Sequence, residues 1–252
     1  MGKFGRYGLV VDTEGYSNQP FYNIGWNVVD LENYESVECF SGCIPETLAE
    51  NLTEKQKRLI SNNPENKALG EMYHNNLYDI LKGFNTKYVY VPSSRGMYQR
   101  LLNVIKKYQI KDIFAYNFPF DRGAFKRTFK EKSFENLDKL LTFHDIQTMI
   151  FYTHCYNLDY VNFCLLNGFL TDKGNISTTA ENIYRYIFND IDFKEEHTAL
   201  SDVFIESDLL FEAIKKNPDV ETKHTAPYAK LNKLFENTPE NRLKMLGDLL
   251  FE

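Results

Sequence analysis

The first forty residues contain three apolar stretches rich in Val, Ile, Tyr and Phe, a composition typical of β-strands. They cover residues 6–12, 21–31 and 34–40. Turn-forming residues at 15–20 and 30–33 separate them. The pattern therefore predicts three successive strands, paired antiparallel, at the start of the fold.

Helix-type periodicity follows the third strand. Segments 46–60 and 67–81 show it on either side of Ser61-Asn62-Asn63-Pro64, a turn signal. We expect a helical insertion over about residues 44–92. An amphipathic helix is predicted next, at 95–109, with one apolar stripe formed by Met97, Leu101, Val104, Ile105 and Tyr108.

Beyond residue 109, short apolar strands alternate with helices, an order typical of α/β proteins. The predicted strands are 110–117 and 141–146, and the predicted helices are 120–132, one starting near 147, 157–169, 178–189, 199–216, 225–235 and 239–251. In helix 199–216 the residues expected to face inward are Leu200, Val203, Phe204, Leu210, Phe211 and Ile214. We predict a main domain over residues 1–216 and a C-terminal helical appendage over 217–252.

Composition agrees with a folded enzyme-sized domain, since 252 residues with 43% hydrophobic and 25% charged side chains suffice for one α/β core. No apolar run approaches the roughly 18 residues that span a bilayer, and the first residues lack a signal-peptide core. We expect a cytoplasmic protein with no membrane partner. Its four cysteines show no zinc-binding spacing and are expected to be buried, reduced thiols: Cys39, Cys43, Cys155 and Cys164.

The formal net charge of −6 argues against a protein that holds nucleic acid through a general basic surface. An acidic nuclease site is compatible with this charge, because bound divalent cations reverse the local field where a phosphate must sit.

Two carboxylates stand where the first apolar strand ends. Asp12 and Glu14 are two residues apart, a spacing that points both side chains to one face of a strand. They could share metal ions, although a solvated turn at a strand end would give the same pattern. Further along, Asn117 ends a second apolar strand and Asp121 opens the next helix, where it could also serve as an N-cap.

The third element places His197 five residues before Asp202, in the first turns of an apolar helix. Five steps on a regular helix would turn the two side chains about 140° apart. Both can therefore face one site only if His197 lies in the preceding loop.

In this order the three elements resemble the DnaQ-like 3′-to-5′ exonucleases of the RNase H-like superfamily, in the class with four acidic residues and a histidine (DEDDh). The positions that match its Asp-x-Glu, Asn-x-x-x-Asp and His-x-x-x-x-Asp motifs are Asp12, Glu14, Asn117, Asp121, His197 and Asp202. The sister class has Tyr at the place of Thr198. The resemblance covers residues 6–215 and implies an α/β fold with an RNase H-like mixed central sheet, three antiparallel strands and then parallel strands, flanked by helices.

The resemblance also implies an activity: release of nucleoside 5′-monophosphates from single-stranded DNA 3′ ends by two-metal hydrolysis. The implied ligands of two divalent cations, Mg²⁺ or Mn²⁺, are Asp12, Glu14, Asp121 and Asp202. His197 would be the general base that takes a proton from the attacking water.

Substrate contacts are expected near these motifs. Tyr16, in the turn after Glu14, is a candidate for stacking on a base. Phe118 is an aromatic candidate that core packing would explain equally well. Asn117 could orient the second motif or touch the substrate, and Arg122 could contact a backbone phosphate or belong to a solvated basic face.

Two other functions fit the same residues. One is a 3′-to-5′ exoribonuclease similar to ribonuclease T or oligoribonuclease, and the other is an inactive nuclease fold that binds nucleic acid as a subunit. The chain end Gly247-Asp248-Leu249-Leu250-Phe251 faintly resembles short peptides that dock on sliding clamps. This similarity suggests a replication or repair partner, with a terminal helix packed on the domain as the alternative.

Overall fold

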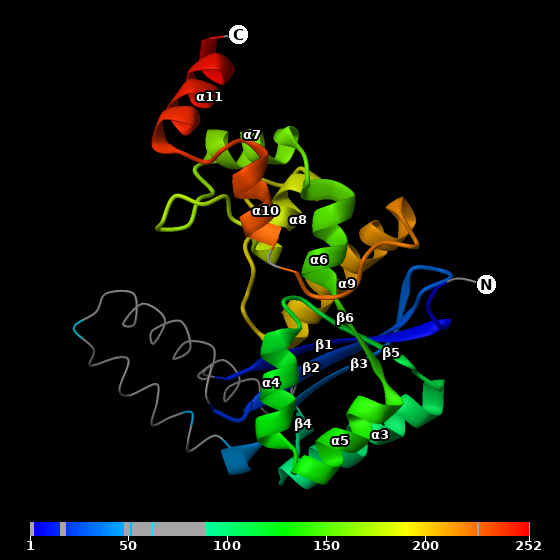
Figure 1. The fold of residues 1–252 in the computed structure, drawn as a ribbon. Helices are drawn as coiled ribbons and strands as arrows, with labels where there is room; N and C mark the ends of the chain where they lie inside the picture. The colour runs from blue at the N-terminus through cyan, green and yellow to red at the C-terminus, as the bar shows by residue number, and fades with distance from the viewer. Residues whose placement is uncertain are drawn as a thin grey trace.

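A six-stranded mixed sheet forms the centre of the molecule, in the order β4-β3-β2-β1-β5-β6 (Figure 1). The computed structural model describes residues 3–15, 19–47, 51, 62, 89–225 and 227–251. The strands are β1 (Tyr7–Glu14), β2 (Asn23–Asp30), β3 (Glu35–Cys43), β4 (Val89–Tyr90), β5 (Asp112–Ala115) and β6 (Thr142–Asp145). β1, β2 and β3 pair antiparallel, and β5 and β6 continue parallel to β1. This confirms the predicted mixed sheet, in which three antiparallel strands are followed by parallel ones.

The first strand is longer than predicted. β1 continues through Glu14 because its register with β2 extends to the pairs Asp12–Gly25 and Glu14–Asn23. Both carboxylates therefore belong to a paired strand rather than to a turn. β4 pairs with the end of β3 inside the segment predicted as a helical insertion, so that prediction is wrong at these two residues. The helices predicted at 46–60 and 67–81 lie almost wholly outside the described residues.

Helices cover both faces of the sheet (Figure 1). On one face lie α3 (Ser94–Tyr108), α4 (Pro119–Thr128) and α5 (Glu131–Leu140). On the other lie α6 (Ile146–Ile150) with a π-helical turn at Phe151–Cys155, α7 (Leu158–Asn167), α8 (Ala180–Phe188) and α9 (Ala199–Lys216). None of the described helices has the length and apolar character needed to cross a membrane.

Alternation along β1 decides which layer each side chain meets. Leu9 and Val11 belong to the core under α3, α4 and α5, whereas Val10 belongs to the core under α6 and α9. Successive residues of a strand point to opposite faces. Asp12 and Glu14 therefore lie on the α9 face with Val10, and Thr13 lies on the α4 face.

Tertiary packing changed three local predictions. The helix predicted at 120–132 is two helices, because Phe129 takes an extended backbone conformation and its buried ring contacts Phe21 and Tyr98. Phe204, predicted to face inward, is 39% exposed. Cys39 is exposed, in contrast to the other three cysteines, which are buried as free thiols.

The C-terminal segment packs back onto the main domain. It contains α10 (Pro227–Leu234) and α11 (Pro239–Phe251), and α11 contacts α7. The side chains of Asn237 and Arg242 both donate hydrogen bonds to the carbonyl of Gly174. Residues 247–251 form the end of α11. Clamp binding through them stays a prediction.

Candidate active site

Three carboxylates from β1 and α9 converge on the α9 face of the sheet. One oxygen from each of Asp12, Glu14 and Asp202 lies within 4.8 Å of the other two. Glu14 and Asp202 are buried, and Asp12 is half-buried. The structure thus brings together the first and third motifs predicted from the sequence.

The start of α9 is fixed by a capping box. Thr198 is the N-cap, its side chain accepts from the Ser201 amide, and the Ser201 hydroxyl accepts from the Thr198 amide. Ser201 Oγ also lies 3.0 Å from Asp202 Oδ1, to which it can donate. The box therefore sets both where the helix begins and how the Asp202 carboxylate is held.

Gly25 on β2 allows this helix to approach the sheet. A Cβ atom at Gly25 would lie 2.1 Å from the carbonyl oxygen of Ala199, the first residue of α9. Real side chains never come so close to a backbone atom. The absence of a side chain at Gly25 is thus a condition for the carboxylate geometry.

Asp121 lies beside this group but not within it. It is the third residue of α4, whose N-cap is Phe118, so Asp121 is not the helix cap that the sequence also allowed. Its side chain is 1% exposed, and Thr13 Oγ1 donates to Asp121 Oδ1 across 2.7 Å. Burial raises the pKa of Asp121 to about 7 despite this hydrogen bond.

His197 lies in the loop before α9, as the sequence required, with a left-handed backbone at φ 53°. Its Nδ1 is 3.7 Å from Glu195 Oε2, and its side chain is 41% exposed. It belongs to a second group of ionisable side chains, with Glu181 and Glu195, and not to the Asp12 group.

A cavity of about 770 Å³ opens over the carboxylates. Asp12, Asp202, Glu195 and Glu206 line one side, and the loop at 171–180 lines the other. Glu195 and Glu206 were not among the site residues predicted from the sequence. For Glu206 a signal existed, since it lies four residues after Asp202 in an otherwise apolar helical stripe.

The predicted substrate-binding residues have different surroundings in the structure. Asn117 lines the cavity. Phe118 is buried against Phe143. Arg122 forms a 2.7 Å ion pair with Asp138 on α5. Tyr16 lies outside the described residues.

Burial and mutual repulsion raise the pKa values of the carboxyl groups at this site. Burial raises the pKa of Asp202 to about 9 and that of Glu195 to about 7. It also raises the pKa values of Asp12, Glu14 and Glu206 well above those of ordinary carboxyls, with nearby acids as the next cause. Among ion pairs between described residues, none connects a lysine or arginine to these five acids.

The donor set fits divalent cations. Asp12 Oδ2 is buried and has no hydrogen-bond partner among the described residues. Clustered carboxylate oxygens are the ligands that Mg²⁺ and Mn²⁺ prefer. A bound cation would supply the positive charge that the surrounding side chains do not.

The metal-free protein should therefore lose stability as pH rises. In the folded state these carboxyls bind protons more tightly than in the unfolded chain, where their pKa is about 4. These groups therefore contribute most to the free energy of unfolding at low pH. Their contribution declines as the pH rises from about 4 to about 9. Thermal unfolding in EDTA should show the decline, and saturating Mg²⁺ should reduce it. A melting temperature in EDTA that rose from pH 6 to pH 9 would contradict this account.

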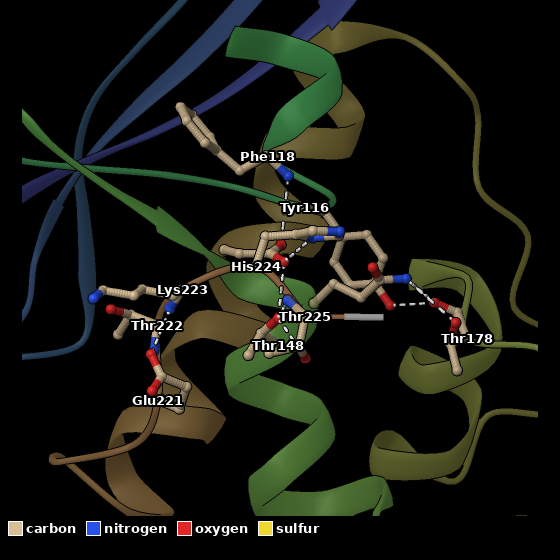
Figure 2. Close-up of polar contacts among 11 residues, drawn as sticks. Tyr116, Phe118, Thr148, Thr178, Glu221, Thr222, Lys223, His224 and Thr225 are labelled. Atoms are coloured by element: carbon tan, nitrogen blue, oxygen red, sulfur yellow. Dashed lines mark hydrogen bonds and ion pairs between the residues drawn. The ribbon is translucent and has the colours of Figure 1, made fainter. Parts of the chain in front are cut away.

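Polar contacts hold the far wall of the cavity. Tyr116 Oη donates to the carbonyl of Thr178 across 2.6 Å (Figure 2). Gln147 Nε2 donates to the same oxygen across 2.9 Å. Both donors come from residues next to the sheet, at the ends of β5 and β6. The loop at 171–180 is thereby tied to the segments that follow β5 and β6, and the second motif lies in the first of these segments.

A buried carboxylate, Asp145, connects the ends of β5 and β6 to the C-terminal segment. It accepts from the Phe118 amide at 3.4 Å and from Thr148 Oγ1 at 2.9 Å, and His224 Nδ1 lies 2.6 Å away. The Thr225 amide donates in turn to Thr148 Oγ1. One side chain thus joins β6, the turn before α4 and the segment at 222–225.

Asp145→Ala should destabilise the protein by about 3 kcal/mol, because several buried donors lose a charged acceptor at once. Urea unfolding measures the change. Asp219→Ala is the matched control, since Asp219 is exposed and should change stability by less than about 0.5 kcal/mol. Equal midpoints for the two variants would show that the Asp145 contacts do not hold the segment.

Comparisons with known proteins give a structural likeness only. No protein-family model matches the sequence, and a comparison with curated proteins finds no relative. Among solved structures, Escherichia coli Exonuclease I in complex with a dA16 oligonucleotide is similar, with a TM-score of 0.43 and 12% identity. The alignment covers 96% of this chain and 46% of that protein, so the chain spans less than half of its length.

Proposed function

We propose that the chain is a metal-dependent 3′-to-5′ exonuclease that releases nucleoside 5′-monophosphates from single-stranded DNA. The observation that carries the proposal is the group formed by Asp12, Glu14 and Asp202, whose oxygens lie within 4.8 Å of one another beneath a cavity. Such a group is costly to bury without a counter-charge. Phosphodiester hydrolysis assisted by divalent cations is a chemistry that uses one.

In this proposal Asp12, Glu14 and Asp202 hold two Mg²⁺ or Mn²⁺ ions. Asp121, which accepts a hydrogen bond from Thr13 beside this group, is the fourth proposed ligand. Bound divalent cations stabilise the negative charge that develops on a phosphodiester during hydrolysis. The protein's own contribution is to fix these carboxylates on a paired strand and a capped helix, two rigid elements.

His197 is proposed as the general base. Its loop lies directly before Asp202's helix, and its Nδ1 is 3.7 Å from Glu195 Oε2, so a small shift would let this carboxylate accept a hydrogen bond and orient the imidazole. Glu195 also lines the cavity, so the pair stands at its border. In the present geometry the imidazole belongs to the Glu195 group, so this role requires it to turn toward the Asp12 group.

The far wall suits a nucleotide. The cavity there is lined by amide and hydroxyl groups that can donate or accept, including Asn117, Gln147, Asn175 and Thr179. The same groups could meet either sugar, so the exoribonuclease alternative is an outcome of the test.

The test is degradation of matched 5′-labelled single-stranded DNA and RNA with Mg²⁺, Mn²⁺ or EDTA. A metal-dependent ladder that shortens from the 3′ end supports the proposal, and the faster polymer identifies the substrate class. No cleavage of either polymer would favour the inactive binding subunit.

His197→Ala should lower the cleavage rate about 10²- to 10⁴-fold while leaving Mn²⁺ affinity unchanged, because it removes proton transfer and no ligand. Lys194→Ala is the control, an exposed residue of the same loop. A His197→Ala protein that cleaves at the wild-type rate would remove this residue from the mechanism.

A further inference from the structure

Glu206 is a buried acid to which the proposed mechanism gives no role. It lies one helical turn after Asp202 on α9 and is 4% exposed. Its Oε2 is buried and has no hydrogen-bond partner among the described residues. Together with Asp12 and Asp202 it lines the cavity. Its carboxylate is not among the oxygens that lie within 4.8 Å of one another in the Asp12 group, so it borders the same cavity beside that group.

The surroundings of Glu206 offer no compensating charge from the protein. The charged groups that act on it are all acids: Asp12, Asp121, Asp202 and Glu195. The next residue, Ser207, accepts a hydrogen bond from Asn27 of β2, a neutral pair. Buried polar atoms are nearly always hydrogen-bonded or bound to an ion. A purely structural glutamic acid would be expected to have a partner for both oxygens.

We propose that Glu206 supplies a fifth carboxylate to the divalent-cation site, as a ligand or through a water held between it and the ion. This rests on the proposed function, since it concerns the same site. Metal sites of this kind often rely on substrate phosphate to complete the ligand set. An additional buried carboxylate strengthens cation binding before substrate arrives. The protein should therefore bind Mn²⁺ in the absence of nucleic acid.

The experiment measures Mn²⁺ binding to the nucleic-acid-free protein by titration calorimetry and by the paramagnetic resonance signal of free Mn²⁺. Glu206→Gln keeps the shape of the side chain and removes its charge. We expect its Mn²⁺ affinity to fall roughly 10- to 100-fold, the range found when groups supporting metal ligands are removed. Asp208→Asn, an exposed acid on the same helix, is the matched control and should bind as the wild type does.

Thermal unfolding in EDTA separates this role from a structural one. Glu206→Gln should be at least as stable as the wild type without metal, because a neutral amide replaces a buried carboxyl that repels the neighbouring acids whenever it is ionised. A Glu206→Gln protein that unfolds more easily in EDTA would contradict the proposal, since it would show that the carboxylate stabilises the metal-free fold. Glu206→Asp keeps the charge and should restore part of the affinity.

The outcomes distinguish this inference from the proposed function. Equal Mn²⁺ affinity in the wild type and Glu206→Gln, with metal-dependent cleavage intact, would overturn the role of Glu206 and leave the exonuclease proposal standing. A wild-type protein that neither binds Mn²⁺ nor cleaves would overturn both.

Discussion

Asp12→Asn is expected to abolish cleavage while making the metal-free protein more stable. Asp12 is at the centre of the carboxylate group, because it shares one oxygen cluster with Glu14 and Asp202 and lines the cavity with Glu206. Losing a cation ligand removes several kcal/mol of transition-state stabilisation, which corresponds to a rate loss of about 10³-fold or more.

The stability change has the opposite sign. Asp12 Oδ2 is buried without a hydrogen-bond partner among the described residues, and nearby acids help to raise the pKa of this carboxyl. An amide of the same shape relieves the repulsion, so the melting temperature in EDTA should rise and its increase on adding Mn²⁺ should shrink. Melting curves with and without Mn²⁺ give both the melting temperature in EDTA and its increase on adding Mn²⁺.

Asp208→Asn is again the control, because it removes an acid from the same helix at an exposed position. It should leave cleavage and the Mn²⁺ response unchanged. An Asp12→Asn protein that retained wild-type cleavage would exclude this carboxylate as a metal ligand. An Asp12→Asn protein with a lower melting temperature in EDTA than the wild type would show that other groups of the protein compensate the charge of Asp12.

The parts of this site that the sequence predicted are those set by local periodicity. The two-residue spacing of Asp12 and Glu14 places them on one strand face whatever the rest of the chain does. The helix predicted at 199–216 has the observed bounds of α9, since an N-cap Thr precedes it and Asn217-Pro218 follows it.

The parts that the sequence did not predict depend on contacts between distant residues. The hydrogen bond from Thr13 to Asp121 spans 108 positions and holds Asp121 beside the Asp12 group. Glu206 belongs to the site only because α9 lies against β1 and β2. A single sequence shows an acid in an apolar stripe but not which strand the stripe covers.

The role of Gly25 depends on both the local sequence pattern and contacts between distant residues. Gly25 lies in the strand predicted at 21–31, yet the reason for a glycine there is visible only in the structure. The α-carbon of Gly25 is paired with Asp12 in the sheet and lies under Ala199 of α9. One residue without a side chain thus sets the separation between the two elements that carry the carboxylates.

Gly25→Ala should accordingly cost both stability and activity. The added methyl group would lie 2.1 Å from the Ala199 carbonyl oxygen and 2.9 Å from the Leu200 amide nitrogen, and backbone atoms cannot turn aside as a flexible side chain can. The first turn of α9 must move away. We expect a loss of about 3 kcal/mol in the free energy of unfolding, at the upper end for overpacked sites.

Cleavage should fall at least about 10²-fold in the molecules that remain folded, because a displacement of about 1 Å at a catalytic group has that effect. Urea unfolding gives the first quantity, and rates measured well below the unfolding midpoint give the second. Gly247→Ala is the control, since nothing lies within 4 Å of a Cβ there and alanine favours its helix. If Gly25→Ala retained wild-type cleavage and Mn²⁺ affinity, the carboxylate site would not depend on the close approach of α9 to β2, and Asp202 would have to reach the cations from a different helix position.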